Sequence, residues 1–225
     1  MSPHHHPADD ILTAYAAGAL EPGFGLVVGA HLETCAHCRA RVAAFEAASG
    51  AALADLPETD VAPDALAKVM ARLDESTPME RGSSDPRHQA TEPSAALKTR
   101  APVDARPLLD RLPLKPRRWV APGVWVAAVD TPHARDNRVY VLSVAPGMPT
   151  ARHEHTGAEF CTVLKGAYRD EIGRFAAGDF AAAYGEFKHQ PVVEGDEACV
   201  CLFATEGRLK PQGLLGRIAF GFADV

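Results

Sequence analysis

The first third of the chain carries apolar residues at the spacing of short amphipathic helices. This pattern and its punctuation predict helices over residues 9–18, 21–32, 36–53 and 63–73. Asp9 and Asp10 place negative charge at the positive end of the first helix, and Pro22 suits the first turn of the second. The last helix carries an apolar stripe made of Leu66, Val69, Met70 and Leu73. Such a stripe either faces a core or contacts a partner.

The pattern changes after residue 112 to short runs rich in β-branched and aromatic residues. These runs cover residues 124–129, 138–144, 160–164, 180–184, 191–193 and 199–203. Glycines and prolines separate the runs at short intervals, and no helical pattern intervenes. This arrangement favours a small antiparallel barrel.

Residues 76–107, between the two patterns, are rich in proline and serine and contain no apolar cluster. Their composition predicts a flexible linker between domains that need not be rigidly fixed. We therefore expect an α+β protein of two domains, with small helices over residues 1–75 and an antiparallel β-barrel over residues 108–225.

Composition is consistent with folded domains. Hydrophobic residues make up 47% of the 225 positions, which is enough for a core. The chain has no apolar run of about 18 residues, and its first residues lack the apolar segment of a signal peptide. We expect no membrane span and a cytoplasmic location, which the odd cysteine count of five also fits.

Charge is unevenly distributed and limits the class of partner. Residues 1–80 hold four basic and twelve acidic residues, a net charge of −8, against −6 for the whole chain. A domain that binds nucleic acid should be basic, so we expect no direct contact with nucleic acid. An acidic helical domain attracts a basic protein, although an acidic surface that serves only solubility has the same composition.

A group of metal-ligand residue types lies at the expected junction of the second and third helices. His31 and Cys35 are four positions apart and share a helix face, and Cys38 follows at the spacing that lets two thiolates bind one ion. Imidazole and thiolate ligands favour zinc over magnesium or calcium. His6 is the best candidate for a fourth ligand, because His37 would be strained to reach the ion.

Other interpretations of these residues stay open. The cysteines could be ordinary helix residues beside a surface histidine, or they could form a disulfide. The run His4-His5-His6 could be the remnant of an expression tag.

The pattern His-x3-Cys-x2-Cys, the histidine about 25 residues before it, and the segment Thr13-Ala14-Tyr15-Ala16-Ala17-Gly18 resemble the zinc-binding anti-sigma domain. The nearest resemblance is to the ChrR-type anti-sigma factors, which join this domain to a C-terminal cupin. Zinc in such a small helical unit is chiefly structural, because it crosslinks helices that bury little surface.

The second half contains a second set of ligand types, in the order Gly147, His153, His155, Glu159 and Gly166. This spacing matches the first cupin motif, and His189 stands eleven positions after Gly178, where the second motif places a histidine. The sequence departs from the second motif at Tyr184, Glu186 and Val193, which occupy positions of proline, glycine and asparagine. These departures affect the turns more than the ligands.

Three histidines and a glutamate suit a divalent transition metal such as zinc, iron, manganese or nickel. The ChrR resemblance implies zinc. The competing interpretation is that His153 and His155 are surface loop residues.

The other cysteines lie on the predicted strands. Cys161 follows Glu159 by two residues, and Cys199 and Cys201 alternate on one strand, so each pair shares a face. Buried free cysteine is usually small apolar filler. A redox-sensitive pair, Cys199 and Cys201, is the functional alternative, although a disulfide between neighbours two apart on a strand has poor geometry.

The resemblance implies an anti-sigma factor that binds an extracytoplasmic-function sigma factor through its N-terminal zinc domain and so represses transcription. The cupin domain would sense oxidative stress, such as singlet oxygen or organic hydroperoxides. The main alternative is a metal-dependent dioxygenase or isomerase, in which Glu154, Tyr168 or Tyr184 would act near the metal. A DNA-binding regulator is disfavoured by the acidic helices.

Overall fold

The structure is a computed structural model. It describes residues 2–74, 107–131, 137–148, 150, 153–154, 157–185, 188–206 and 210–211. The chain forms two compact units, one made of residues 1–49 and 105–225 and the other of residues 50–104. Most of the expected linker lies outside the described residues, and the expected domain boundaries stay predictions.

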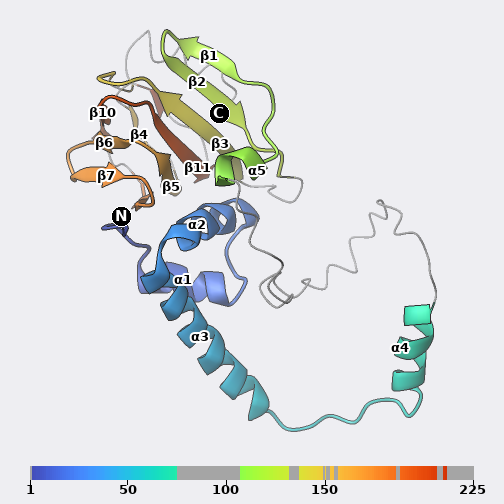
Figure 1. Ribbon diagram of the computed structural model, residues 1–225. Helices are drawn as coiled ribbons and strands as arrows, with labels where there is room; N and C mark the ends of the chain where they lie inside the picture. The colour runs from blue at the N-terminus through green and yellow to red at the C-terminus, as the bar shows by residue number, and fades with distance from the viewer. Residues whose placement is uncertain are drawn as a thin grey trace. The chain divides into compact units, whose positions relative to one another are not determined.

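The N-terminal region is helical, as the periodicity predicts (Figure 1). Helices α1 (Asp9–Ala16), α2 (Pro22–Thr34) and α3 (Ala36–Ala54) follow one another closely. Gly18 ends the first helical segment with a φ of 66°, a conformation that glycine adopts without strain. Cys35 is extended, with φ −101° and ψ 102°, and this single residue separates α2 from α3.

Helix α4 (Ala65–Asp74) belongs to the second unit and has an exposed apolar stripe. The exposed fractions are 74% for Leu66, 56% for Val69 and 52% for Met70. The side chain of Leu73 lies outside the described residues. Among the helices of the described segments, none is both long and apolar enough to cross a bilayer.

The C-terminal half is the expected antiparallel β structure, preceded by a short helix, α5 (Leu108–Arg111), that the sequence pattern did not indicate. Its largest sheet has the order β1-β2-β3-β11-β5-β8. These strands are β1 (Arg118–Ala121), β2 (Val124–Ala128), β3 (Asn137–Val144), β11 (Cys199–Glu206), β5 (Glu159–Lys165) and β8 (Phe180–Ala183).

Two small sheets complete the fold, with the orders β10-β6-β7 and β12-β4-β9. Their strands are β10 (Val192–Glu194), β6 (Ala167–Arg169), β7 (Arg174–Ala176), β12 (Lys210–Pro211), β4 (His153–Glu154) and β9 (Lys188–His189). All the pairings among these strands are antiparallel. The structure therefore confirms the helical region followed by a cupin-type antiparallel β domain.

Helix α2 packs on the large sheet, against β5, β11 and β3 (Figure 1). The ring of Phe24 lies 4.5 Å from that of Phe160 between centroids, and the hydroxyl of Thr162 donates a 2.8 Å hydrogen bond to the carbonyl of Val27. Val27 and Val28 are fully buried in the same core as Leu202 of β11. The helices and the barrel thus share one core.

This shared core differs from the independent domains that the linker composition suggested. The reason lies in α2, whose apolar residues are too numerous to form one narrow stripe on the helix. The other short helices could not cover all of them, and some would be exposed to water. The outer face of the sheet covers them. Strand β5 is accordingly buried along most of its length, since α2 covers one face and the barrel interior lies on the other.

We predict that Phe160→Ala lowers the free energy of unfolding by about 3–5 kcal/mol, because the ring fills the joint between α2 and the sheet. Denaturant unfolding monitored by helical and by near-ultraviolet signals should give one coincident transition. Trp119→Ala is the control, since Trp119 is 69% exposed and its loss should cost less than about 0.5 kcal/mol. Two separate transitions in the wild-type protein would contradict a shared core.

Candidate metal centres

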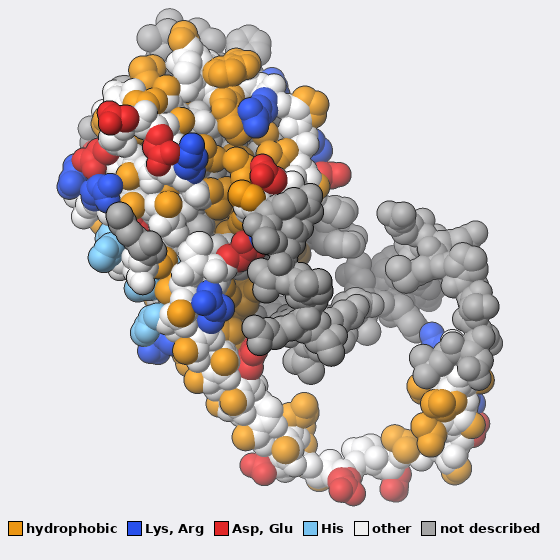
Figure 2. Space-filling model, viewed as in Figure 1, with side chains coloured by type: hydrophobic (Ala, Val, Ile, Leu, Met, Phe, Trp, Pro, Cys, Tyr) orange, Lys and Arg blue, Asp and Glu red, His pale blue; other side chains and the backbone are white. Residues whose placement is uncertain are grey.

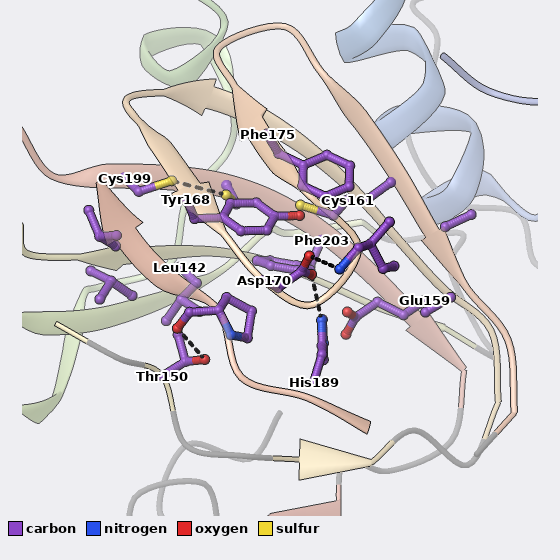
Figure 3. Close-up of a pocket in the computed structure, with 18 of the residues that line it drawn as sticks. Leu142, Thr150, Glu159, Cys161, Tyr168, Asp170, Phe175, His189, Cys199 and Phe203 are labelled. Atoms are coloured by element: carbon purple, nitrogen blue, oxygen red, sulfur yellow. Dashed lines mark hydrogen bonds and ion pairs between the residues drawn. The ribbon is translucent and has the colours of Figure 1, made fainter. Parts of the chain in front are cut away.

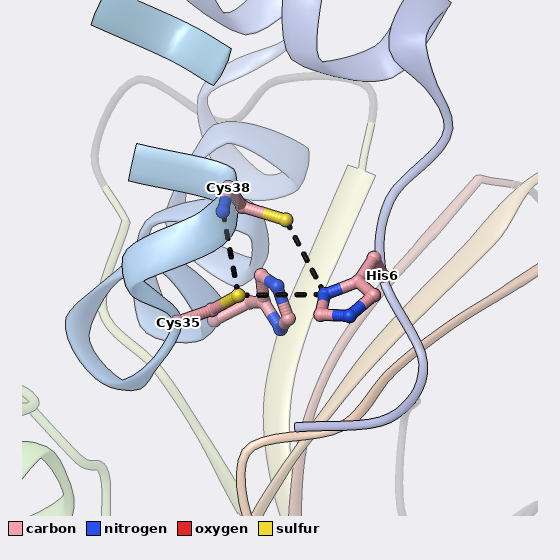
Figure 4. Close-up of side chains that lie close together, drawn as sticks. His6, Cys35 and Cys38 are labelled. Carbon is pink, nitrogen blue, oxygen red and sulfur yellow. Dashed lines mark hydrogen bonds between the residues drawn. The ribbon is translucent and has the colours of Figure 1, made fainter. Parts of the chain in front are cut away.

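The structure brings His6, His31, Cys35 and Cys38 together (Figure 4). One ligand atom from each residue lies within 4.8 Å of all the others. His6 comes from the segment before α1, His31 from the last turn of α2, Cys35 from the break, and Cys38 from the first turn of α3. The break at Cys35 turns both sulfur atoms toward one point.

The interatomic distances fit tetrahedral coordination. His6 Nδ1 lies 3.4 Å from the Sγ atoms of both Cys35 and Cys38. Zinc bonds of about 2.3 Å to sulfur and 2.0–2.1 Å to nitrogen, at tetrahedral angles, place sulfur and nitrogen about 3.5 Å apart. The backbone N–H of Cys38 also donates a 3.4 Å bond to Cys35 Sγ, which stabilises negative charge on that sulfur.

His31 is oriented as a metal ligand. Its Nδ1–H donates a 2.7 Å hydrogen bond to the carbonyl of Gly178, which leaves Nε2 as the atom with a free lone pair. Nε2 is buried and has no hydrogen-bond partner among the described residues. Burial lowers the pKa of His31, partly opposed by the Gly178 bond, so the ring is neutral at physiological pH. An orphaned buried nitrogen facing two thiols is what a bound cation would satisfy.

The two cysteines of this site are free thiols, so the disulfide interpretation does not describe this structure. Burial, together with the hydrogen bond to Cys35, raises the pKa of Cys38 to about 12. Without a cation the Cys38 sulfur therefore stays protonated, and a divalent ion would replace that proton. The ring of His37 lies 5.3 Å from that of His6, outside the four-residue cluster.

The second candidate centre opens into a cavity of about 70 Å³ inside the barrel (Figure 3). Its wall is mainly apolar and aromatic. Polar ligand types gather at Glu159 and His189, and thiols line the wall at Cys161, Cys199 and Cys201. Glu159 and Cys161 on β5, and the two cysteines on β11, alternate with the residues that face α2, as strand geometry requires.

Glu159 and His189 are both buried on this cavity. Burial raises the pKa of Glu159 to about 8. His189 Nδ1 donates a 3.0 Å hydrogen bond to Asp170 Oδ2, which fixes the orientation of the ring on the cavity wall. Burial alone would raise the pKa of Asp170, but bonds from His189 and from two backbone N–H groups lower it overall, and the carboxylate stays charged.

The other two expected cupin ligands are only partly described. The backbone of His153 pairs with that of His189 across β4 and β9, which places the two residues at one level of the small sheet. The side chain of His153 and the whole of His155 lie outside the described residues. The sequence pattern did not identify Asp170 as a partner of His189, although an aspartate three residues before Gly173 is a common turn signal.

The three barrel thiols are buried and close together. Cys199 Sγ and Cys201 Sγ lie 3.6 Å apart (Figure 3). The hydrogen bond between Cys199 and Cys201, with burial, raises the pKa of Cys199, and burial raises the pKa of Cys161. These thiols are therefore protonated and slow as nucleophiles in this state.

The enzyme interpretation names three alternative residues, and the structure describes the side chains of two of them. Tyr168 is buried on the cavity wall, whereas Tyr184 is 59% exposed. The side chain of Glu154 lies outside the described residues.

Comparison with known proteins identifies the family. The family model described as the ChrR Cupin-like domain matches residues 114–209. The chain is 35% identical over 224 residues to the anti-sigma-E factor ChrR of Cereibacter sphaeroides, covering 99% of both proteins.

A solved structure agrees with this assignment. A crystal structure of Rhodobacter sphaeroides SigE in complex with the anti-sigma ChrR matches with a TM-score of 0.70 and 37% identity, covering 91% of this chain and 100% of that one. An RmlC-like cupin protein from Ralstonia eutropha JMP134 matches with a TM-score of 0.40 and 21% identity, over 46% of this chain and 69% of its own. Because it is 35% identical to ChrR over nearly its full length, this chain belongs to the ChrR family of anti-sigma factors, which are regulatory proteins and not enzymes.

Proposed function

We propose that the chain binds an extracytoplasmic-function sigma factor through its N-terminal helices and thereby represses transcription in the cytoplasm. The observation that carries this proposal is the 37% identity, over 91% of the chain, to a ChrR protein crystallised with SigE. Repression follows from sterics, because a sigma surface covered by one protein is closed to RNA polymerase.

Helix α4 has the properties of a docking helix. Leu66, Val69 and Met70 are each more than half exposed, and Figure 2 shows hydrophobic side chains gathered on this helix. Apolar side chains at helical spacing fit a hydrophobic groove on a partner. The net charge of −8 over residues 1–80 complements a sigma factor, whose DNA-binding surfaces are basic, and opposes contact with nucleic acid itself.

We propose that zinc occupies the site made by His6, His31, Cys35 and Cys38. The ligand types, the 3.4 Å sulfur–nitrogen distances and the unpaired nitrogen of His31 fit that ion. When bound, zinc supplies a crosslink with no open position for chemistry. The four residues join the N-terminal segment, α2 and α3, so the crosslink fixes the surface offered to the sigma factor.

The barrel is proposed to hold zinc or another divalent transition metal between His153, His155, Glu159 and His189. A buried carboxyl group with a raised pKa would be stabilised in its charged form by a cation. Asp170 orients the ring of His189 through the hydrogen bond to Nδ1.

We propose that the barrel senses oxidants through its cavity. Cys199 and Cys201, with Cys161 beside them, are oxidisable groups on an apolar wall that suits an organic hydroperoxide. In the proposed step a thiol sulfur attacks the peroxide, the O–O bond breaks, the thiol proton passes to the departing oxygen, and sulfenic acid and alcohol result. The added oxygen would crowd the face of β11 opposite to the one that contacts α2.

We predict that replacing Cys35 and Cys38 by alanine removes about one metal ion per chain and abolishes capture of the extracytoplasmic-function sigma factor that the chain binds, because the helices lose their crosslink. Metal analysis and a pull-down measure the two effects. Cys161→Ala removes a thiol from the barrel and serves as the control that keeps both properties. Full sigma binding by the metal-free variant would contradict a scaffold role for zinc.

We predict that Val69→Asp weakens sigma binding by about tenfold or more, because a charge would enter the apolar contact. Calorimetric titration measures the affinity. The melting temperature should stay unchanged, since the side chain is exposed in the free protein. Lys68→Ala is the matched control, because Lys68 is exposed on the same helix and pairs with Asp64. Equal losses from both variants would argue against the stripe as the contact.

We predict that cumene hydroperoxide adds oxygen to the wild-type protein and releases the sigma factor, whereas Cys199→Ala combined with Cys201→Ala blocks both events. Intact mass spectrometry follows the modification, and gel filtration follows the complex. Release from the double variant at the wild-type dose would remove these thiols from the sensing step.

A further inference from the structure

The segment that carries His6 is fastened to the barrel immediately before that residue. Asp179 Oδ1 accepts backbone hydrogen bonds from His4 at 2.6 Å and from His5 at 3.0 Å. The backbone N–H of Phe180 in turn donates a 3.1 Å bond to the carbonyl of His5. The N-terminal segment therefore continues the hydrogen bonding of the barrel at the turn between β7 and β8.

The side chain of His5 adds a second attachment. Its ring lies 4.3 Å from that of Phe175 between centroids, and its Nε2 is 3.0 Å from the carbonyl of Arg174. Main-chain and side-chain contacts thus hold His5, the residue before His6, against β7 and the start of β8. The barrel therefore fixes the direction in which the backbone continues from His5 to His6.

The same turn also orients a second ligand. The carbonyl of Gly178 accepts the 2.7 Å bond from His31 Nδ1 that leaves Nε2 available to a cation. Gly178 has a φ of +93°, and a Cβ there would lie 2.9 Å from Thr34 Oγ1 and 3.0 Å from Pro3 Cγ. The turn is therefore in close contact with both the end of α2 and the N-terminal segment.

The turn itself is kept in shape by the same carboxylate. Asp179 Oδ2 accepts a 2.8 Å bond from the backbone N–H of Ala176, while Oδ1 holds the N-terminal segment. One side chain therefore ties the barrel turn to the position of His6, and its neighbour Gly178 orients His31.

We infer that Asp179 is a positioning residue for the site made by His6, His31, Cys35 and Cys38. The barrel thus holds two of the ligands in place, although it contributes none of the four. The inference rests on the proposed metal site. Groups that hold ligands in place without touching the metal typically contribute 10–100-fold to its affinity. Movement of the β7–β8 turn would then change the affinity of the helical region for its ion. In this way the barrel would act directly on the helices that bind the sigma factor.

The test uses the full-length chain, stripped of metal and titrated with Co²⁺, followed by competition for Zn²⁺ against a chromogenic chelator. Only a site with cysteine ligands gives sulfur-to-cobalt charge-transfer absorption, so the barrel's histidine and glutamate ligands do not contribute. Asp179→Ala should weaken metal binding at this site about 10–100-fold and speed zinc release. Asp179→Asn should restore part of the affinity, because its amide oxygen can still accept both N–H groups of the segment, whereas its amide nitrogen cannot accept the bond from Ala176.

A second variant avoids changing the barrel turn. His5→Ala removes the contacts with Phe175 and Arg174 from the N-terminal side, and it should weaken metal binding in the same direction. Thr162→Val is the matched control, because it deletes the hydrogen bond between the barrel and Val27 without touching the N-terminal segment. It should lower unfolding stability and leave cobalt and zinc affinity at the wild-type level.

Each result that would contradict the inference can be distinguished from the others. Wild-type affinity in both Asp179→Ala and His5→Ala overturns the positioning role and leaves the metal site standing. An equal loss of affinity in Thr162→Val also overturns it, since general loosening of the interface would then explain the effect. Absence of charge-transfer absorption in the wild-type protein overturns the proposed metal site itself.

Discussion

The packing of α2 on the outer face of β5 and β11 is the interaction on which the rest of the structure depends. It buries apolar residues that short helices cannot cover for themselves, and it gives a small helical region the core of a larger domain. It also brings the end of α2 onto the β7–β8 turn, where Gly178 meets His31. The metal site and the shared core are therefore built by the same contact.

Strand β5 lies between the cavity and α2, because its side chains alternate between the two. Glu159 and Cys161 face the cavity, while Phe160 and Thr162 face α2. The strand is close-packed on the α2 side, so a displacement of its backbone is passed on to the helix. Chemistry inside the barrel is thus one residue of backbone away from the helix that supports the anti-sigma surface.

The sequence was informative wherever the signal is local. His31 and Cys35 are one helical turn apart, Cys38 follows in the first turn of the next helix, and alternation along a strand puts Cys199 and Cys201 on one face. It was silent where the partners lie far apart in the chain. Asp170 and Asp179 are ordinary turn aspartates in the sequence, and their bonds to His189 and to the N-terminal segment depend on tertiary contacts. The linker composition suggested independent domains for the same reason, since it contains no information on which surfaces meet.

The shared core has a consequence for a chain that has been nicked. The compact unit consists of residues 1–49 and 105–225, so it is assembled from both ends of the sequence. A protease that cut anywhere between those stretches would leave two fragments still joined by the buried face of α2. Scission of the backbone alone would not liberate the barrel, and degradation of the repressor would have to begin by pulling the fragments apart.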